Sequence, residues 1–229
     1  MKNIFLMITS LFFIHTAIGK ETTAYELSNF ETLVVIGNFP VEVVQSDRKE
    51  AIVNKHSDKV DLNNLSFSYT NKVLTIKYSG SFVETIDLHI IIYTPSPIAN
   101  VEARRGAEIR INEAGDFESS VSYKVDSGSK MLIENINAPT VKAEITKGGS
   151  IRITGKTELF EPTVKTGGTI AAVRLKSKEV IANITFGGEI ICGPTKILNA
   201  KVTSGGTINY TGNPDITQKI TLGGTIEKI

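Results

Sequence analysis

The sequence has few of the residues that usually build catalytic or metal centres. Its 229 residues include one cysteine, no tryptophan and three histidines. A single cysteine cannot form an internal disulfide, so burial and backbone pairing must hold the fold together. His56 and His89 lack the spacing of metal ligands, and neither a Ser-His-Asp elbow nor an HExxH motif occurs. We therefore predict no catalytic residues, no metal and no cofactor.

An excess of charge of one sign is also lacking. The chain has 25 Lys and Arg against 24 Asp and Glu, for a formal net charge of +1. Nucleic-acid-binding proteins normally carry a basic patch, so nucleic acid is not an expected partner. Long apolar runs are missing as well. A membrane-spanning helix needs about 20 apolar residues, and no stretch of the sequence reaches that length. We expect no membrane span in the mature chain.

The N-terminus, residues 1–19, is typical of a secretory signal peptide. Lys2 supplies a positive start, an apolar segment runs from Ile4 to Ile14, and small residues stand at Ala17 and Gly19. The apolar segment is too short for a membrane anchor. We therefore expect cleavage after Gly19 and an exported chain, in the periplasm, at the cell surface or outside the cell.

A repeat of 18 to 22 residues organises the second half of the chain. Each copy is centred on a glycine corner, and the residues three before and three after the first glycine are always apolar. Apolar and polar residues alternate on both sides, which indicates half-buried strands rather than helices. The corners need glycine because tight bends between strands favour positive φ. The corner glycines are Gly106, Gly128, Gly148, Gly167, Gly187, Gly205 and Gly223.

One such repeat cannot bury its own apolar face, whereas stacked copies form a continuous core. We therefore predict an all-β fold, with a right-handed parallel β-helix (solenoid) of about seven turns over residues 101–229. Residues 20–100 show strand character without the repeat. They are predicted to form an irregular N-terminal β cap with the first irregular turns.

The register also separates inward from outward positions. Cys192 falls in an inward column with Ile133, Ile153 and Ala172, so a buried, inert thiol is favoured over a nucleophile. Outward positions are mainly Thr, Lys and Glu. Threonines in columns could form a flat surface for ice or crystals, but charged residues interrupt the columns. Solvated strands are therefore the favoured interpretation.

The densest charge cluster contains Arg104, Arg105, Glu108 and Arg110, with Glu102 nearby. A guanidinium group suits bidentate binding of carboxylates, which makes these four residues candidates for a binding surface. A solvated face with pairing between neighbouring strands explains the same cluster.

Four features carry a family resemblance: the segment Val34 to Val43 (VVIGNFPVEV), residues 91–97 (IIYTPSP), the serial glycine corners, and residues 206–214 (GTINYTGNP). In this order, they make the chain resemble the autotransporter adhesin, head GIN domain family, which occurs mainly in exported proteins of Bacteroidota. The resemblance implies a β-helix at the envelope or cell surface, and it brings no catalytic residues.

These observations favour a non-enzymatic exported solenoid that serves as an adhesin-like or envelope interaction module. Its partner is unidentified, and a cell-surface glycan or protein suits an extended outer surface. One alternative is a structural or signalling envelope component without an external ligand. Another is a polysaccharide-active enzyme, because parallel β-helices also carry such enzymes, although a fold alone does not establish a function.

Overall fold

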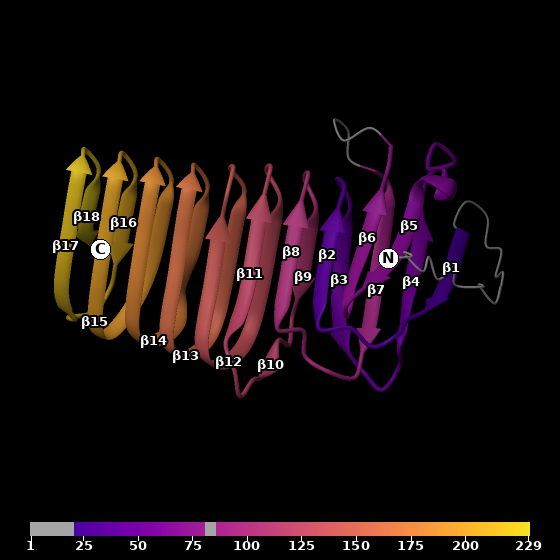
Figure 1. Ribbon diagram of the computed structural model, residues 1–229, viewed down its shortest axis with the longest axis horizontal. Coiled ribbons are helices and arrows are strands. Elements are labelled where there is room, and N and C mark those ends of the chain that lie inside the picture. Colours follow the sequence, from indigo (N-terminus) through magenta and orange to yellow (C-terminus); the bar gives the residue numbers. More distant parts are fainter. Residues whose placement is uncertain (1–20, 81–85) are drawn as a thin grey trace.

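The computed structural model describes residues 21–80 and 86–229, and about 70% of them are in strands (Figure 1). The predicted signal peptide lies outside the described residues. Within these ranges the only helical element is a single 3-10 turn, η1 (Leu62–Asn64). No helix of the described chain is long and apolar enough to cross a membrane.

The strands form a parallel β-solenoid of about six turns (Figure 1). Each of the seven corner glycines predicted from the sequence lies between two strands, and the predicted solenoid fold is confirmed. Each turn gives one strand to a first sheet, before its corner, and one to a second sheet, after it. The first sheet contains β8 (Asn100–Arg104), β11 (Val121–Asp126), β17 (Asp215–Leu222) and the later parts of β12 (Lys130–Ile145), β13 (Ser150–Thr166), β14 (Thr169–Phe186) and β15 (Glu189–Ser204). The second contains β9 (Glu108–Ile111), the early parts of β12 to β15, β16 (Thr207–Tyr210) and β18 (Thr225–Lys228).

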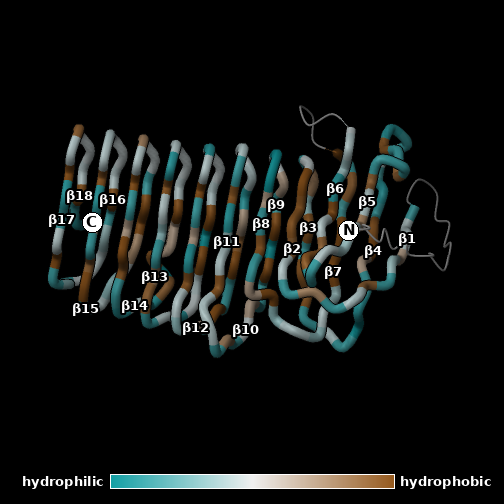
Figure 2. The backbone as a smooth tube through the Cα atoms, viewed as in Figure 1, coloured by the Kyte–Doolittle hydropathy of each residue, from teal (hydrophilic) through white to brown (hydrophobic). Residues whose placement is uncertain are grey.

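Successive turns pair in parallel and in the predicted register. The apolar residues three before each corner glycine stack as one column: Ala103, Val125, Ile145, Val164, Ile184, Val202 and Ile220. All but the last of these are at most 1% exposed. In Figure 2 the apolar residues accordingly recur from turn to turn along the solenoid. The core is therefore a continuous stack of side chains between the two sheets.

The N-terminal layers do not follow the order of the sequence. β2 (Thr32–Ile36) and β3 (Pro40–Gln45) form a solenoid turn that pairs in parallel with β8 and β9. On the other side, β6 (Val73–Tyr78) pairs with β2, and β7 (Leu88–Thr94) pairs with β3. The first turn of the chain is thus enclosed between two later ones (Figure 1).

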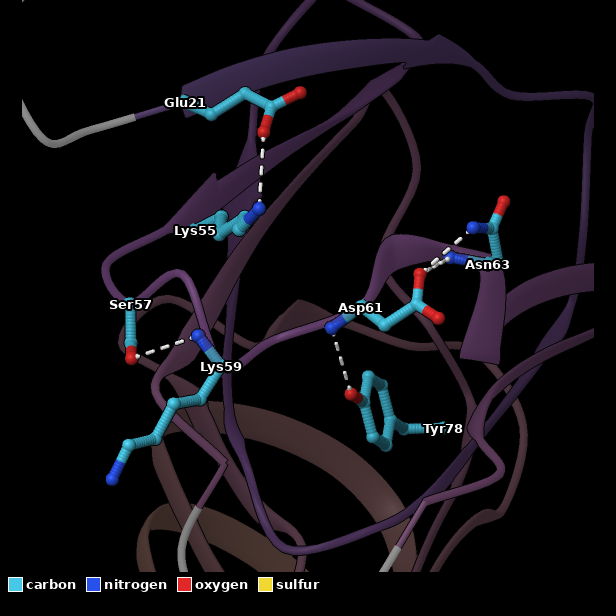
Figure 3. Close-up of polar contacts among 7 residues, drawn as sticks. All are labelled: Glu21, Lys55, Ser57, Lys59, Asp61, Asn63 and Tyr78. Carbon is cyan, nitrogen blue, oxygen red and sulfur yellow. Dashed lines mark hydrogen bonds and ion pairs between the residues drawn. The ribbon is translucent and has the colours of Figure 1, made fainter.

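Antiparallel strands close this end of the stack. β5 (Leu65–Thr70) covers β6, while β4 (Glu50–Lys55) covers β7 and is covered in turn by β1 (Glu21–Glu26). Polar contacts hold the cap together (Figure 3): Lys55 bonds Glu21 across the strands at 3.4 Å, and the Asp61 amide donates to the Tyr78 hydroxyl at 3.2 Å. The short β10 (Gly115–Asp116) pairs with β12 at the bend opposite the glycine corners.

Two consecutive glycines serve different purposes at each regular corner. Gly187 has φ +62°, and a Cβ added there would meet nothing within 4 Å. Gly188 has φ +97°, and a Cβ there would lie 2.7 Å from the carbonyl oxygen of Gly168 in the preceding turn. The first glycine is therefore required by backbone conformation alone. The second is required also because the turns approach each other there backbone to backbone.

The corners at Gly106 and Gly128 place positive φ at different positions from the regular corners. The positive-φ pairs are Arg105 with Gly106 and Ser127 with Gly128, one residue earlier than in the regular corners. Ser129, in the place of the second glycine, is fully buried. Its hydroxyl donates to the Asp126 carbonyl at 2.8 Å and accepts from the Gly106 amide at 3.1 Å. A serine side chain thus links two corners where later turns use glycine.

This difference predicts unequal effects of alanine at one corner. Gly187→Ala should cost about 1–2 kcal/mol, because only the backbone conformation is unfavourable. Gly188→Ala adds a clash with the preceding turn, worth about 1–3 kcal/mol more. Urea unfolding of both variants measures the difference. Equal losses would show that the second glycine is not in close contact with its neighbour.

The inward and outward register predicts a second contrast. Ala182 is fully buried and pairs with Ala200, so Ala182→Asp places an unpaired charge in the core. We expect a loss of about 3 kcal/mol or more. Lys201 follows Ala200 on β15 and is exposed, so Lys201→Asp should change stability by less than about 0.5 kcal/mol. Similar melting temperatures for the two variants would refute the assigned faces.

Candidate functional site

The structure divides the predicted charge cluster between two faces. Arg104 lies on the outer face of the first sheet, where its Nε donates to Glu102 Oε1 at 2.7 Å. That hydrogen bond is the main reason why the pKa of Arg104 is raised. Arg105 occupies the corner itself, at φ +59°. Glu108 and Arg110 follow on the second sheet, so the corner separates them from Arg104.

Glu108 and Arg110 form one wall of a groove on the second sheet. The groove has a volume of about 630 Å³ and crosses β7, β3 and β9. We call it the N-terminal groove; its lining residues are Pro40, Val41, Glu42, His56, Ile86, Asp87, Leu88, His89, Glu108 and Arg110. The predicted charge residues thus meet side chains from segments that are distant in the sequence.

The layer order of the fold creates this groove. Because β3 pairs with β9, Pro40 stands beside Glu108, and Glu42 stands beside Arg110. On its other side β3 pairs with β7, which contributes Leu88 and His89. Glu42 is held in place by the amide of Asn112, which donates to its Oε1 at 3.1 Å.

A second cavity adjoins the N-terminal groove toward the glycine corners. It also has a volume of about 630 Å³, and it shares Pro40 and Glu108 with the groove. Arg105 and Lys130 add two cations to its lining. Lys130 lies beside Glu108 on the neighbouring strand, so a basic and an acidic side chain stand next to each other in this lining.

The chemistry of the groove suits recognition of a polar ligand. Apolar side chains provide a floor, and the walls carry imidazole, carboxylate and guanidinium groups that can donate and accept hydrogen bonds. Among the described residues, no three His, Cys, Asp or Glu side chains are grouped so that they could hold a metal ion. Sequence reasoning found Glu108 and Arg110. It missed Glu42, Asp87 and the two histidines, because they reach the site only through the order of the layers.

Cys192 occupies the inward position predicted for it. It is fully buried on β15, between Ala172 and Tyr210 of the neighbouring turns. Burial raises the pKa of its thiol to about 12. The thiol is therefore protonated at neutral pH, and it is not a nucleophile.

Comparisons with known proteins identify both a family and a fold. Residues 29–214 match the sequence profile of the family described as "Putative auto-transporter adhesin, head GIN domain". No functionally curated protein matches the chain.

Three similar solved structures come from Bacteroidota. A "putative adhesin" of Bacteroides fragilis superposes with a TM-score of 0.80 at 17% identity, over 93% of this chain and 98% of that one. A "putative adhesin" of Parabacteroides merdae and a "putative lipid binding protein" of Parabacteroides distasonis each give a TM-score of 0.68 at 18% identity, over 93% of this chain and 97% of theirs. At such identities the likeness establishes the fold.

The buried thiol predicts slow chemistry at Cys192. A maleimide reagent should label the native protein only after denaturant is added, because the side chain has no exposed surface. The raised pKa also has a consequence for stability, since the folded state holds this proton more tightly than the unfolded state. The resulting contribution to the free energy of unfolding is complete below the thiol's unfolded pKa of about 9, and it is lost as the pH rises toward about 12. Rapid labelling of the native protein would contradict the assigned register at this turn.

Proposed function

Since the chain belongs to the putative auto-transporter adhesin, head GIN domain family, we propose that it is an exported, non-enzymatic binding module of the adhesin type. The observation that carries this proposal is the N-terminal groove, in which charged and apolar side chains meet on a rigid sheet. Export rests on the signal-peptide pattern of residues 1–19.

Binding takes place on the outside of the solenoid. The inward columns are filled by buried Val, Ile and Ala side chains, which leaves the outer faces and the groove for contact with a partner. Repeat proteins recognise large partners through such extended surfaces. A cell-surface glycan or protein fits this geometry better than a small metabolite does.

The chemistry of the site supports binding rather than turnover. Arg110 stands beside Glu42 and two residues from Glu108, so the local carboxylates face a cation instead of a second acid. Glu42, Asp87 and Glu108 all line the groove, and the proposal assigns them hydrogen bonds to a partner rather than acid–base catalysis. The single cysteine is buried and protonated, which removes the other candidate nucleophile.

The proposal predicts that one charge reversal weakens binding while a matched reversal does not. Arg110→Glu changes the wall of the groove, and loss of a charged hydrogen bond should lower affinity by about tenfold or more. Arg152→Glu is the control. Arg152 lies in the same outward column two strands away, is likewise exposed, and does not line the groove.

The experiment screens the chain from residue 20 onward against glycan arrays, extracellular matrix proteins and bacterial and host cells. Binding constants of the two variants are then compared for whatever partner is captured. Equal affinities would exclude the groove as the site. Cleavage of any polysaccharide in a parallel assay would contradict the non-enzymatic function, and absence of any binding would favour a structural role in the envelope.

A further inference from the structure

The two ends of the solenoid differ in how they are protected. At the N-terminal end the outermost strands, β1 and β5, are antiparallel to the strands they pair with, whereas at the C-terminal end β17 and β18 are parallel to theirs (Figure 1). Among the described strands, each of these four pairs on one side only. Three apolar side chains of β17 are partly open: Ile216 is 39% exposed, Ile220 44% and Leu222 71%. An edge of unpaired backbone groups beside apolar side chains favours pairing with another strand. We call this surface the C-terminal edge.

The charges on the C-terminal edge are arranged so that the edge complements itself. Lys219 stands four residues before the corner glycine Gly223, and Glu227 stands four residues after it. Both are exposed, and neither forms an ion pair within the described chain. Within its own sheet Lys219 lies beside Lys201, and Glu227 lies beside Asn209. Each charge therefore lacks an opposite partner on its own molecule.

The other residues of the edge follow the same symmetry about Gly223. The apolar pair is Ile220 and Ile226, three residues before and after the glycine. Thr221 and Thr225 stand two residues away on either side. The two polar residues in inward positions, Gln218 and Lys228, both stand five residues away. The four residues of β18 thus each have a chemically suitable counterpart on β17 at the same distance from the corner.

We propose that the C-terminal edge is a homodimer interface, at which two copies stack end to end. A two-fold axis parallel to the strands, between the two sheets, lays β17 of each copy antiparallel against β18 of the other. Residues at equal distances from the corner then face each other. Lys219 meets the partner's Glu227, Ile220 meets the partner's Ile226, and Gln218 meets the partner's Lys228. Each contact occurs twice, as in any isologous interface.

The asymmetry of the two ends limits the assembly to two copies. An interface with two-fold symmetry uses both C-terminal edges, and only the capped ends then face outward. The cap strands are antiparallel to the layers beneath them and offer no copy of the C-terminal edge. The arrangement therefore doubles the length of the solenoid and does not grow into a filament.

Charge exchange tests the proposed register. Sedimentation velocity of the chain from residue 20 onward, from low micromolar to several hundred micromolar, should show a monomer–dimer equilibrium. Lys219→Glu sets like charges against each other at both contacts, and so does Glu227→Lys. Each change should raise the dimer dissociation constant by about tenfold or more. The double variant Lys219→Glu/Glu227→Lys restores opposite charges and should dimerise as the unmodified chain does.

Two further variants serve as control and as independent test. Lys124→Glu reverses a charge in the same outward column several turns away and should leave the dimer unchanged. Ile220→Lys inserts a charge into the centre of the contact and should give monomers with an unchanged β-sheet circular dichroism spectrum. A monomer at all concentrations would overturn the proposal. So would assemblies larger than dimers, or a dimer indifferent to the charge reversals.

Discussion

The hydrogen bond from one glycine corner to the next is the contact on which the whole solenoid depends. The amide of Glu189 donates to the carbonyl of Gly168 at 2.9 Å, and the amide of Thr207 donates to Gly188 at 2.9 Å in the same way. This ladder forms only where the backbones approach closely, which excludes a Cβ at the second glycine. It keeps the turns in register, and the register in turn aligns every apolar column in the core.

A fixed register also determines what the outer surface can offer. Because side chains alternate between the two faces of a strand, the outward residues of successive turns form regular rows. In the N-terminal layers the strand order departs from the sequence order: β3 lies between β7 and β9, which brings Glu42 beside Arg110. The groove thus occurs where the repeat is interrupted.

The repeat pattern predicted which residues face inward, but it did not predict the order of the N-terminal layers. Val164 and Cys192 were placed inward because each belongs to a column of apolar residues at constant spacing. The order of the layers could not be inferred, since Val34 and Val35 look alike whether β2 pairs with β6, β8 or both. The different reasons for glycine at the two corner positions were also missed, because the reason at the second position is the contact between successive turns. His89 entered the site only through that unpredicted order.

The enclosed position of β2 and β3 gives the chain a seed for folding. Both edges of this turn carry parallel strands, so the layers on either side of it are aligned on the same template. β6 and β7 complete one edge and become sealed by the cap, and β8 and β9 then begin on the other. From there each turn needs only the one before it, so loops between contacts stay near 20 residues and their closure entropy stays small. Turns can thus be gained or lost during evolution without disturbing the seed.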